Sequence, residues 1–429
     1  MGIHLPGALR PLLLSALAAW WPTAVGAASY GRHVRILHTS DWHLGRSFHR
    51  EDLLGHQGAF VDHLLEVVEA EKVDVVVVSG DVYDRALPHV DAVALADETF
   101  ARLAASRAKV VVSSGNHDSA QRLGFGSRLM DAAGVFVRTS AASVGSPVVL
   151  KDRHGDVAIH AIPFLDPSAL LEPWSLGHRS HEAALSEAMT RVRRDLAART
   201  KTRSVVLAHA FVAGATPSES ERDISVGGVS RVATSTFDGI DYTALGHLHG
   251  PHVLSDALRY SGSPLAYSFS EADQVKGSWL VELNAKGFAS ARWIDAPVPR
   301  RLSRISGSLA DLLTDRSLAD REQDWVQATL TDVPRPARAM EQLRRRFPRT
   351  LVLQFPAPVT DVQAPGRPAP GTSDHAIALD FVRHVRGVEA TPAESALLQD
   401  AFDACCHDPE LDVLVGASLG SDNDGGRSA

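Results

Sequence analysis

Five short clusters of Asp, Asn and His residues each follow directly after an apolar run of the sequence. Carboxylate, amide and imidazole groups are the ligands that suit divalent cations such as Mn²⁺, Fe²⁺ and Zn²⁺. Thiolates are absent from the clusters, because the only two cysteines are the adjacent Cys405 and Cys406. The clusters therefore predict a metal centre with oxygen and nitrogen donors. They are Asp41-Trp42-His43, Gly80-Asp81, Gly115-Asn116-His117-Asp118, His209 and Gly246-His247-Leu248-His249.

A centre with two metal ions is the arrangement that these residue types favour. Asp81 is the natural candidate for a carboxylate shared by both ions, which would hold them ~3.5–4 Å apart so that both reach one phosphoryl group. A single His after a strand is usually a hydrogen-bonded turn residue, and an Asp after Gly is usually a turn or a helix cap. Five such clusters in order, all at strand ends, favour the metal centre.

Short apolar runs alternate with helical stretches from residue 34 onward and would position the clusters. The first strands are predicted at Val34–Leu37, Val73–Val78 and Lys109–Val112, with helices at Gln57–Glu71 and Val90–Ser106 between them. Because loops at the carboxyl ends of strands carry the chemistry of open α/β folds, the pattern predicts a layered α/β sandwich. The later strands are predicted at Val157–Ile162, Ser204–Leu207, Tyr242–Leu245 and Ser278–Leu283.

Composition shifts divide the 429 residues into a main domain and smaller C-terminal parts. The main domain is predicted at 34–296, and a small α+β unit at 297–356 carries strands Trp325–Leu330 and Thr350–Phe355 beside helix Pro336–Arg346. Residues 357–374 are rich in Pro and Gly and are typical of a linker. The last parts are predicted as two amphipathic helices within 375–404, His375–Arg386 and Pro392–Ala404, and a disordered tail at 405–429.

The first 33 residues have two interpretations. Arg10, the apolar run 12–21 and the small residues 24–28 are typical of a secretory signal peptide. Alternatively, the start is mis-called and translation begins near Val34, which would make the protein cytoplasmic. We favour the second interpretation; a native N-terminus near Ala28 or Ser29 would contradict it. The apolar run is too short to span a bilayer comfortably, so no membrane association is predicted.

Bulk composition excludes some modes of action. The net charge of −8 argues against binding nucleic acid through overall charge, so local basic patches would have to contact phosphates. The glycine-rich segment 225–230 lacks the lysine and the spacing of a phosphate-binding loop, so the chain should not bind ATP itself.

The clusters also carry a family resemblance. D-x-H, G-D, G-N-H-D, H and G-H-x-H in this order resemble the motifs of the calcineurin-like metallophosphoesterases. The flanking stretches HTSDWHLG, SGDVYDRALP, SSGNHDS, ALGHLHGPH and YSGSPLAYSFSE are similar to those of the SbcD branch, the nuclease subunits of bacterial SbcCD complexes. The resemblance covers residues 34–355 and extends toward 404. It implies an α/β/β/α sandwich with a small C-terminal α+β capping domain and a helical tail.

The resemblance implies a role for each motif residue. His117 would contact the phosphate and protonate the leaving group, and Asp118 would orient the His117 imidazole. A water activated by one metal would attack the phosphate in line. The resemblance implies two divalent metal ions and favours Mn²⁺ as their identity. One would be held by Asp41, His43, Asp81 and His249, and the other by Asp81, Asn116, His209 and His247.

The same resemblance implies substrate and partners. The substrate would be DNA, trimmed 3′-to-5′ at duplex ends and cut in single strands and hairpins, in repair, replication and recombination. An SbcC-type coiled-coil ATPase would bind helices 375–404, although these could instead pack on their own domain. A homodimer within a heterotetramer is the implied assembly.

Residues near the motifs remain open. Tyr83, Arg85 and Arg122 follow metal loops and could contact the DNA backbone or be ordinary surface groups. Arg344–Arg346 could contact phosphate or form an exposed helix face, and His38 could support a ligand. The remaining histidines are interpreted as surface or structural: His33, His49, His56, His63, His89, His154, His160 and His252.

Two rival functions share the predicted fold. A secreted nucleotidase or a cyclic-nucleotide phosphodiesterase is favoured by the signal-like N-terminus, but the motif flanks and the extension over 297–404 oppose it. A non-catalytic binding module is opposed by the intact set of ligands.

Overall fold

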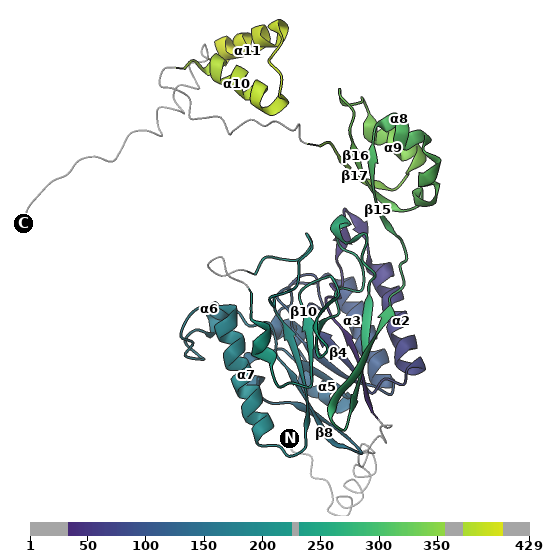
Figure 1. Cartoon of the computed structure of the whole chain (residues 1–429), viewed down its shortest axis with the longest axis vertical. Coiled ribbons are helices and arrows are strands. Elements are labelled where there is room, and N and C mark those ends of the chain that lie inside the picture. Colours follow the sequence, from purple (N-terminus) through teal and green to yellow (C-terminus); the bar gives the residue numbers. More distant parts are fainter. Residues whose placement is uncertain (1–32, 225–230, 357–371, 406–429) are drawn as a thin grey trace, which may run out of the picture. The chain divides into compact units, whose positions relative to one another are not determined.

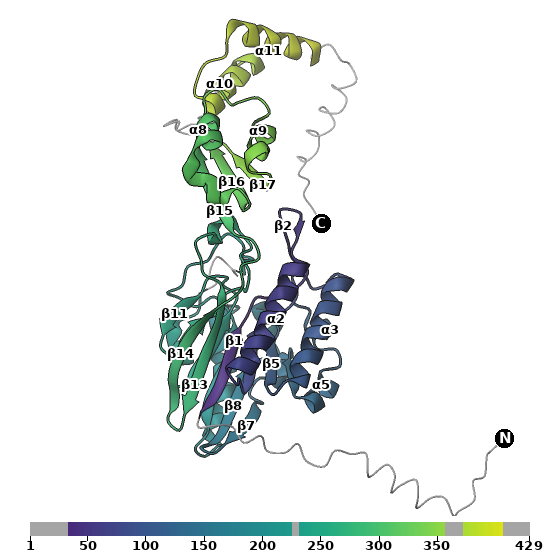
Figure 2. The same cartoon turned by 90° about the vertical axis from the view of Figure 1, so that its right-hand side faces the viewer.

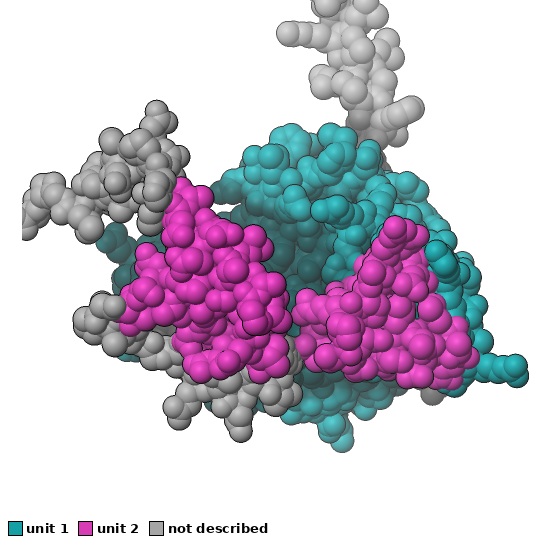
Figure 3. All heavy atoms as spheres, turned by 90° about the horizontal axis from the view of Figure 1, so that it is seen from above, with its two compact units in different colours: residues 1–304, 316–327, 344–352 teal, residues 305–315, 328–343, 353–429 magenta. Residues whose placement is uncertain are grey.

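A computed structural model describes residues 33–224, 231–356 and 372–405. The chain divides into two compact units (Figure 3): residues 1–304, 316–327 and 344–352 form the first, and residues 305–315, 328–343 and 353–429 the second. The signal-like segment up to residue 32, most of the predicted linker, the segment 225–230 and the tail from residue 406 lie outside the described residues. Within the described ranges, no helix is both long and apolar enough to cross a membrane.

The first sheet has the strand order β14-β13-β1-β4-β5-β6. Strands β1, β4, β5 and β6 are parallel neighbours, and β13 pairs with β1 in the antiparallel sense. Parallel strands end at the same edge, so the loops after them gather there. The strands are β1 (Val34–Thr39), β4 (Val75–Ser79), β5 (Lys109–Ser113), β6 (Val135–Arg138), β13 (Gly277–Asn284) and β14 (Gly287–Asp295).

The second sheet has the order β11-β12-β10-β9-β8-β7, and its strands β8, β9, β10 and β12 are parallel. Its β9 and β10 end level with each other, since His209 is paired with Gly246. The strands are β7 (Val148–Asp152), β8 (Gly155–Ala161), β9 (Arg203–His209), β10 (Tyr242–Gly246), β11 (His252–Ser255) and β12 (Leu258–Tyr260).

Alternating side chains bury both faces of each sheet. Val75 and Val77 of β4 point into the core between the two sheets, whereas Val76 and Val78 pack under helices. Since a strand turns successive side chains to opposite faces, a continuous apolar run such as VVVV indicates a strand covered on both sides. Figure 1 shows the helices outside the paired sheets, α2 (Leu54–Ala70) and α3 (Val90–Ala105) on one side and α7 (His181–Ala197) on the other. Figure 2, turned by 90°, shows α2 and α3 again beside strand β1. The predicted layered α/β sandwich is confirmed.

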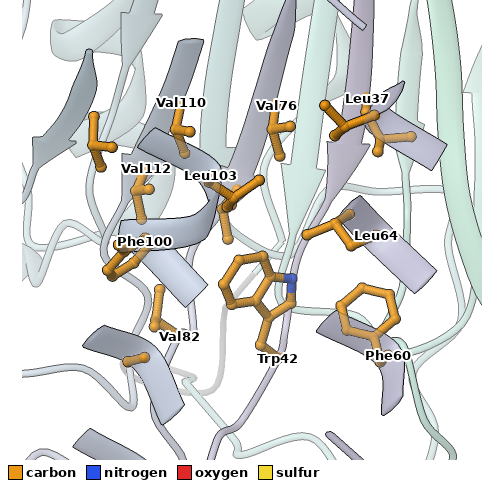
Figure 4. Packing of buried hydrophobic residues seen from close by; sticks show 14 of the residues in the cluster. Leu37, Trp42, Phe60, Leu64, Val76, Val82, Phe100, Leu103, Val110 and Val112 are labelled. Carbon is orange, nitrogen blue, oxygen red and sulfur yellow. The ribbon is translucent and has the colours of Figure 1, made fainter. Parts of the chain in front are cut away.

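The core under α2 and α3 includes a residue of the first metal motif. Trp42 is fully buried and lies between Phe60 of α2 and Phe100 of α3 (Figure 4). Its indole nitrogen donates to Thr39 Oγ1 at 3.0 Å. The loop that carries Asp41 and His43 is therefore anchored in the hydrophobic core.

Several short elements were not predicted, because they are too brief to show a clear hydrophobic period. The helices among them are α4 (Ala120–Leu123), α5 (Ser127–Ala133) and α6 (Pro167–Leu170), with 3₁₀ turns at Ala141–Ser143, Thr234–Phe237, Phe269–Glu271 and Arg316–Arg321. The paired strands β2 (Ser47–Phe48) and β3 (Glu51–Asp52) belong to this set. The prediction also missed strands β6, β7, β11, β12 and β14 and the longer helix α7.

The region after residue 301 contains a three-stranded sheet of order β15-β16-β17, with strands Leu302–Gly307, Trp325–Leu330 and Thr350–Gln354. Helices α8 (Leu309–Thr314) and α9 (Ala339–Arg346) also lie in this region. The prediction missed β15 and α8, and it began α9 three residues too early. Arg338 has a φ of 51°, which is incompatible with a right-handed helix, so α9 starts after it.

Helices α10 (Asp374–Arg386) and α11 (Pro392–Cys405) match the predicted pair within one residue at each end. The Ser373 side chain caps α10 by accepting a hydrogen bond from the Ala376 amide, and Gly387, with a φ of 73°, ends it. The Arg386 guanidinium binds both carboxylate oxygens of Glu394 and joins the two helices.

Candidate metal centre

Loops at the ends of five strands bring the predicted ligands together. Asp41 and His43 follow β1, Asp81 follows β4 and Asn116 follows β5, all at one edge of the first sheet. The second sheet supplies His209 at the end of β9 and the pair His247 and His249 after β10. The two sheets face each other across a shared core, so the two sets of loops meet.

Four of these ligands have a positive φ angle, a backbone conformation that residues other than glycine rarely adopt. The φ angles are 53° at Asp41, 46° at His43, 52° at Asp81 and 102° at His247. Such conformations cost on the order of 1–3 kcal/mol each and persist where the surrounding structure enforces them, most often at functional sites. Glycine is required beside them: a Cβ on Gly115 would lie 2.0 Å from Asp81 Oδ1.

One group of ligands surrounds His43. Its Nε2 lies 3.0 Å from His249 Nε2 and 3.6 Å from Asp81 Oδ2. Ligand atoms of Asp41, His43 and His249 all lie within 4.8 Å of one another. This spacing fits a single cation between them.

The other group surrounds Asn116. Its Oδ1 lies 2.8 Å from His209 Nε2 and 3.1 Å from His247 Nδ1. His209 Nε2 is also 3.4 Å from Asp81 Oδ2, the oxygen that approaches His43. One carboxylate oxygen thus stands between both groups, which is the arrangement expected of a carboxylate shared by two ions.

Burial makes these groups costly unless a cation compensates them. Asp41, His43, Asp81, His209, His247 and His249 are each at most 4% exposed. Among the described residues, His43 Nδ1 and the Asn116 amide nitrogen are buried without a hydrogen-bond partner. Buried charged groups ordinarily pair or coordinate metals. The donor set, all oxygen and nitrogen, therefore fits divalent cations.

The buried Asp81 carboxylate and His209 imidazole stabilise each other's charged forms. Burial by itself lowers the pKa of His209, but the adjacent Asp81 carboxylate outweighs it and raises this pKa to about 9. Burial also opposes ionisation of Asp81, yet His209 and His43 hold its pKa well below the usual range. The Asp81–His209 pair is thus charged at neutral pH, and a bound cation would displace the imidazole proton.

Comparison with known families identifies this geometry. The calcineurin-like phosphoesterase model matches residues 34–251, the range that contains every predicted ligand. The chain belongs to the calcineurin-like phosphoesterase family. This membership and the ligand set support a dinuclear phosphoesterase that uses divalent metal ions. A second family model, an SbcD C-terminal domain described as the Type 5 capsule protein repressor C-terminal domain, matches residues 298–371.

Solved structures similar to this phosphoesterase have low sequence identity. The protein TT1561 of Thermus thermophilus is 11% identical, with a TM-score of 0.36 over 61% of this chain and 99% of its own. The Plasmodium protein described as "GAP50 the anchor in the inner membrane complex" is 12% identical, with a TM-score of 0.35 over 79% and 100%. A dimetal phosphatase from Danio rerio is 14% identical, with a TM-score of 0.34 over 62% and 99%. At these TM-scores the likenesses carry no argument about the activity of this chain.

Among the described residues, no hydrogen bond joins Asp118 to the imidazole of His117, so the expectation that Asp118 orients this ring has no direct contact behind it. The Asp118 carboxylate accepts from the backbone amides of Val82, Tyr83 and Gly115, at 2.9–3.1 Å, and so joins the loops after β4 and β5. Backbone amides at the two loop ends satisfy its oxygens instead. His117 Nδ1 lies 2.7 Å from the Asp84 carbonyl oxygen, which can only accept, so Nδ1 donates.

An open cleft of about 430 Å³ adjoins His117 in this phosphoesterase domain. Arg46, Arg85, Arg222 and Asp84 line it with His117. Arg46 is fixed by a 3.0 Å hydrogen bond to the Ser220 carbonyl and by the Tyr267 ring 4.8 Å from its guanidinium carbon. Its NH1 is buried 3.7 Å from Asp84 Oδ1 and has no hydrogen-bond partner within the described part of the chain. Sequence reasoning missed Arg46, although it stands three residues after His43.

The other predicted contacts to DNA have mixed outcomes. Tyr83 is buried in the core under α2 and α3, so a contact with DNA is not supported. Arg122 donates to the Ala86 carbonyl at 3.0 Å, whereas the Arg85 side chain is 80% exposed at the cleft. His38 bridges the sheets through Tyr242 and the Leu245 carbonyl.

The arginine run at the end of α9 is partly engaged within the protein. Arg344 donates to the Thr350 carbonyl, and Arg346 pairs with Glu322 at 3.0 Å. These two guanidinium groups therefore stabilise the strand and turns beside α9, and the structure gives no support to the prediction that they contact phosphate.

Proposed function

We propose that this chain is the nuclease subunit of an SbcCD-type complex, which hydrolyses DNA phosphodiester bonds with two Mn²⁺ ions in the cytoplasm. The proposal includes 3′-to-5′ trimming of duplex ends and cutting of single strands and hairpins, in DNA repair, replication and recombination. The observation that carries it is the succession, on one chain, of a dinuclear ligand set and a segment that matches the SbcD C-terminal domain.

The two groups of ligands would each hold one ion. When bound, a pair of ions supplies an activated water as nucleophile and stabilises the charge that develops on the phosphoryl group. Asp81 stands in both groups because of its central oxygen. The groups are Asp41, His43, Asp81 and His249, and Asp81, Asn116, His209 and His247.

His117 is proposed to give the proton to the leaving sugar oxygen. Because its Nδ1 donates to the Asp84 carbonyl, the ring is held in place and Nε2 remains available for the substrate. A positioned imidazole of this kind contributes ~10²–10⁴-fold to a proton-transfer step. Asp118 acts at a distance, by fixing the loop that carries His117.

The arginines of the cleft support a polyanionic substrate. Arg46, Arg85 and Arg222 outnumber the single carboxylate of Asp84 in the lining. A chain with a net charge of −8 does not attract DNA through its overall charge, so the local arginines must contact the phosphates. Phosphates that flank the scissile bond are the groups that these side chains would bind.

Cleavage of end-labelled duplex and hairpin DNA tests the proposal. Purified protein is incubated with Mn²⁺ or Mg²⁺, with and without an SbcC-type ATPase and ATP, beside an Asp81→Ala control. Since the ions supply several kcal/mol to the transition state, the control should lose roughly 10³–10⁴-fold of the activity. DNA left intact by a wild-type protein that binds two ions would contradict the nuclease assignment and favour a small-substrate phosphoesterase.

Helices α10 and α11 are proposed as the docking element for the ATPase partner. Ile377, Phe381 and Val385 recur every four residues along α10, which places them on one face. They are 37%, 63% and 53% exposed, and Leu397 of α11 is 70% exposed. An apolar helical face of this kind fits the side of a coiled coil. Deletion of residues 370–429 should abolish partner binding and spare Mn²⁺-dependent cleavage.

A second exposed apolar group supports the proposed homodimer. One part of this group is at the start of α3, with Leu87 before the helix and Val90 and Val93 in its first turn. The other part is at α5, with Phe125 before the helix and Leu129 within it. All five side chains are at least 43% exposed. Val93 and Phe125 line the same open pocket, and contiguous exposed apolar surface commonly marks protein interfaces. Sedimentation of the wild type should give a dimer and that of Phe125→Asp a monomer, whereas a monomeric wild type would contradict the homodimer.

A further inference from the structure

A buried acid and a buried lysine lie directly behind the metal ligand His249. Glu271 is fully buried and Lys276 is 4% exposed, and their side chains form an ion pair. Burying two charged groups costs desolvation energy, so a pair of this kind beside a metal ligand calls for an explanation. The contacts of the pair with its neighbours supply one.

Ser220 connects Glu271 to the imidazole of His249. The Ser220 hydroxyl donates to Glu271 Oε1, and the same oxygen of Ser220 contacts His249 Nδ1. A hydroxyl has one proton to donate, and a carboxylate can only accept. Because that proton goes to Glu271, Ser220 must accept from His249, so Nδ1 carries a proton. The lone pair of His249 is thereby placed on Nε2, the atom that lies 3.0 Å from His43 Nε2 in the metal centre.

Lys276 and Glu221 hold the backbone of the same residue. The Lys276 ammonium donates to the His249 carbonyl at 2.8 Å as well as to Glu271. The His249 amide donates to Glu221 Oε1 at 2.7 Å. The side chain and both backbone groups of His249 are therefore fixed together, and its ring has little freedom to rotate away from the metal centre.

We propose that Ser220, Glu271 and Lys276 are positioning residues that fix the tautomer of His249 and so set the occupancy of one of the two metal positions. The proposal rests on the two-ion site of the proposed function and on no property of DNA. Hydrogen-bond partners of metal-ligating histidines typically contribute 10–100-fold to metal affinity. Loss of the partners should therefore weaken one ion and leave the other in place.

The test is calorimetric titration of metal-free protein with Mn²⁺, accompanied by visible absorption spectra with Co²⁺. The variants are Ser220→Ala, which removes the connecting hydroxyl from a half-buried loop, Ser220→Thr, which keeps it, and Glu271→Gln. We expect two bound ions in the wild type and in Ser220→Thr. In Ser220→Ala and Glu271→Gln, one ion should bind about 10–100-fold more weakly, with a changed Co²⁺ spectrum.

A matched control is available in the same domain. Arg203 and Asp152 form another buried ion pair, with side chains 5% and 0% exposed. Arg203 starts β9 and His209 ends it, so the pair lies at the opposite end of that strand from the metal centre. Asp152→Asn should lower thermal stability and leave both Mn²⁺ affinities unchanged.

Several results would overturn the proposal. These are two ions bound at wild-type affinity by folded Ser220→Ala, equal weakening of metal binding by Asp152→Asn, or a wild type that binds no Mn²⁺. Should Glu271→Gln fail to fold, Ser220→Ala alone decides. Because binding is measured without DNA, a wild type that holds two ions but leaves DNA intact would contradict the nuclease assignment and not the role of these residues.

Discussion

The metal centre and the α10–α11 helix pair depart from ordinary burial in opposite directions. In the metal centre, six carboxylate and imidazole residues are buried to 4% exposure or less. In the helix pair, Phe381 and Leu397 expose more than half of their surfaces. A buried polar group and an exposed apolar group are the informative exceptions to the rule of apolar interiors. The chemistry of each exception is the basis for its proposed partner, a cation in one region and a protein in the other.

The two regions also differ in what can be read from sequence. A metal position accepts few residue types, so its motif is specific. A docking helix accepts many apolar residues, so its sequence pattern predicts only an apolar binding surface. The identity of the partner can then be proposed only from the family resemblance. Substitutions confined to one region can show whether the two regions have separate functions. Their expected effects on DNA cleavage decrease from the metal centre to the helix pair.

The largest effect is expected from His117→Ala. The variant should keep both metal ions and lose about 10²–10⁴-fold of its DNA cleavage rate, because it lacks the proton donor to the leaving oxygen. Single-turnover cleavage and metal content measured on the same preparation check this. His89→Ala, at an exposed position before α3, is the control. A variant that lost a metal ion would instead make His117 a ligand, since a ring nitrogen lies within 4.8 Å of donor atoms of Asp81 and His43.

Most of the fold and the ligand set could be predicted from sequence because each rests on a local pattern. Strand β16 has the predicted bounds, and helices α3 and α10 differ by one residue at one end. The ligands follow strands whose apolar runs are continuous, which is typical of strands buried on both faces. The structure brings all seven predicted ligands together.

What could not be predicted depends on contacts between distant segments. The motif places Asp118 beside His117 in sequence, yet the Asp118 oxygens are occupied by amides from two loops. His117 is held instead by the carbonyl of Asp84, 33 residues away. Arg46 became a candidate only because Tyr267 and Ser220 fix it at the cleft. None of these partners leaves a signal in the local sequence.

A second prediction concerns the pH dependence of the phosphoesterase core. Burial lowers the pKa of His38 to about 3, and the neutral ring accepts from Tyr242 and donates to the Leu245 carbonyl. Between pH 6.5 and 3 the unfolded chain thus binds one more proton than the folded one, and stability falls as the pH falls. At pH 5 the loss relative to pH 7 should be about 2 kcal/mol.

Urea denaturation of the wild type and of His38→Gln at pH 7 and pH 5 measures this difference. His38→Gln should lose about 2 kcal/mol less than the wild type between the two pH values. Tyr242→Phe, which breaks the same hydrogen bond and keeps the imidazole, should be less stable at both pH values and retain the wild-type dependence. An equal pH dependence in wild type and His38→Gln would contradict the assignment.

A third, smaller effect is expected from Arg46→Ala. A charge-assisted hydrogen bond to a flanking phosphate contributes about 1.5 kcal/mol, so KM for an oligonucleotide should rise roughly tenfold. Hydrolysis of bis(4-nitrophenyl) phosphate, which has no flanking phosphate, should change little. Arg85→Ala, with a side chain 80% exposed, should have a weaker effect. Equal losses on both substrates would place Arg46 in support of the metal centre instead.

The smallest effect on cleavage is expected from Phe381→Asp in α10. Phe381 is 63% exposed, so its replacement should change stability by no more than about 0.5 kcal/mol and leave Mn²⁺-dependent cleavage unaltered. Binding to the SbcC-type ATPase should weaken at least about 30-fold, because an exposed aromatic anchor commonly contributes about 2 kcal/mol or more to an interface. Asp400→Asn, an exposed change on α11, is the control for partner binding. If Phe381→Asp instead lowered cleavage in the absence of the partner, the helix pair would belong to the active site, and the two regions would not be functionally separate.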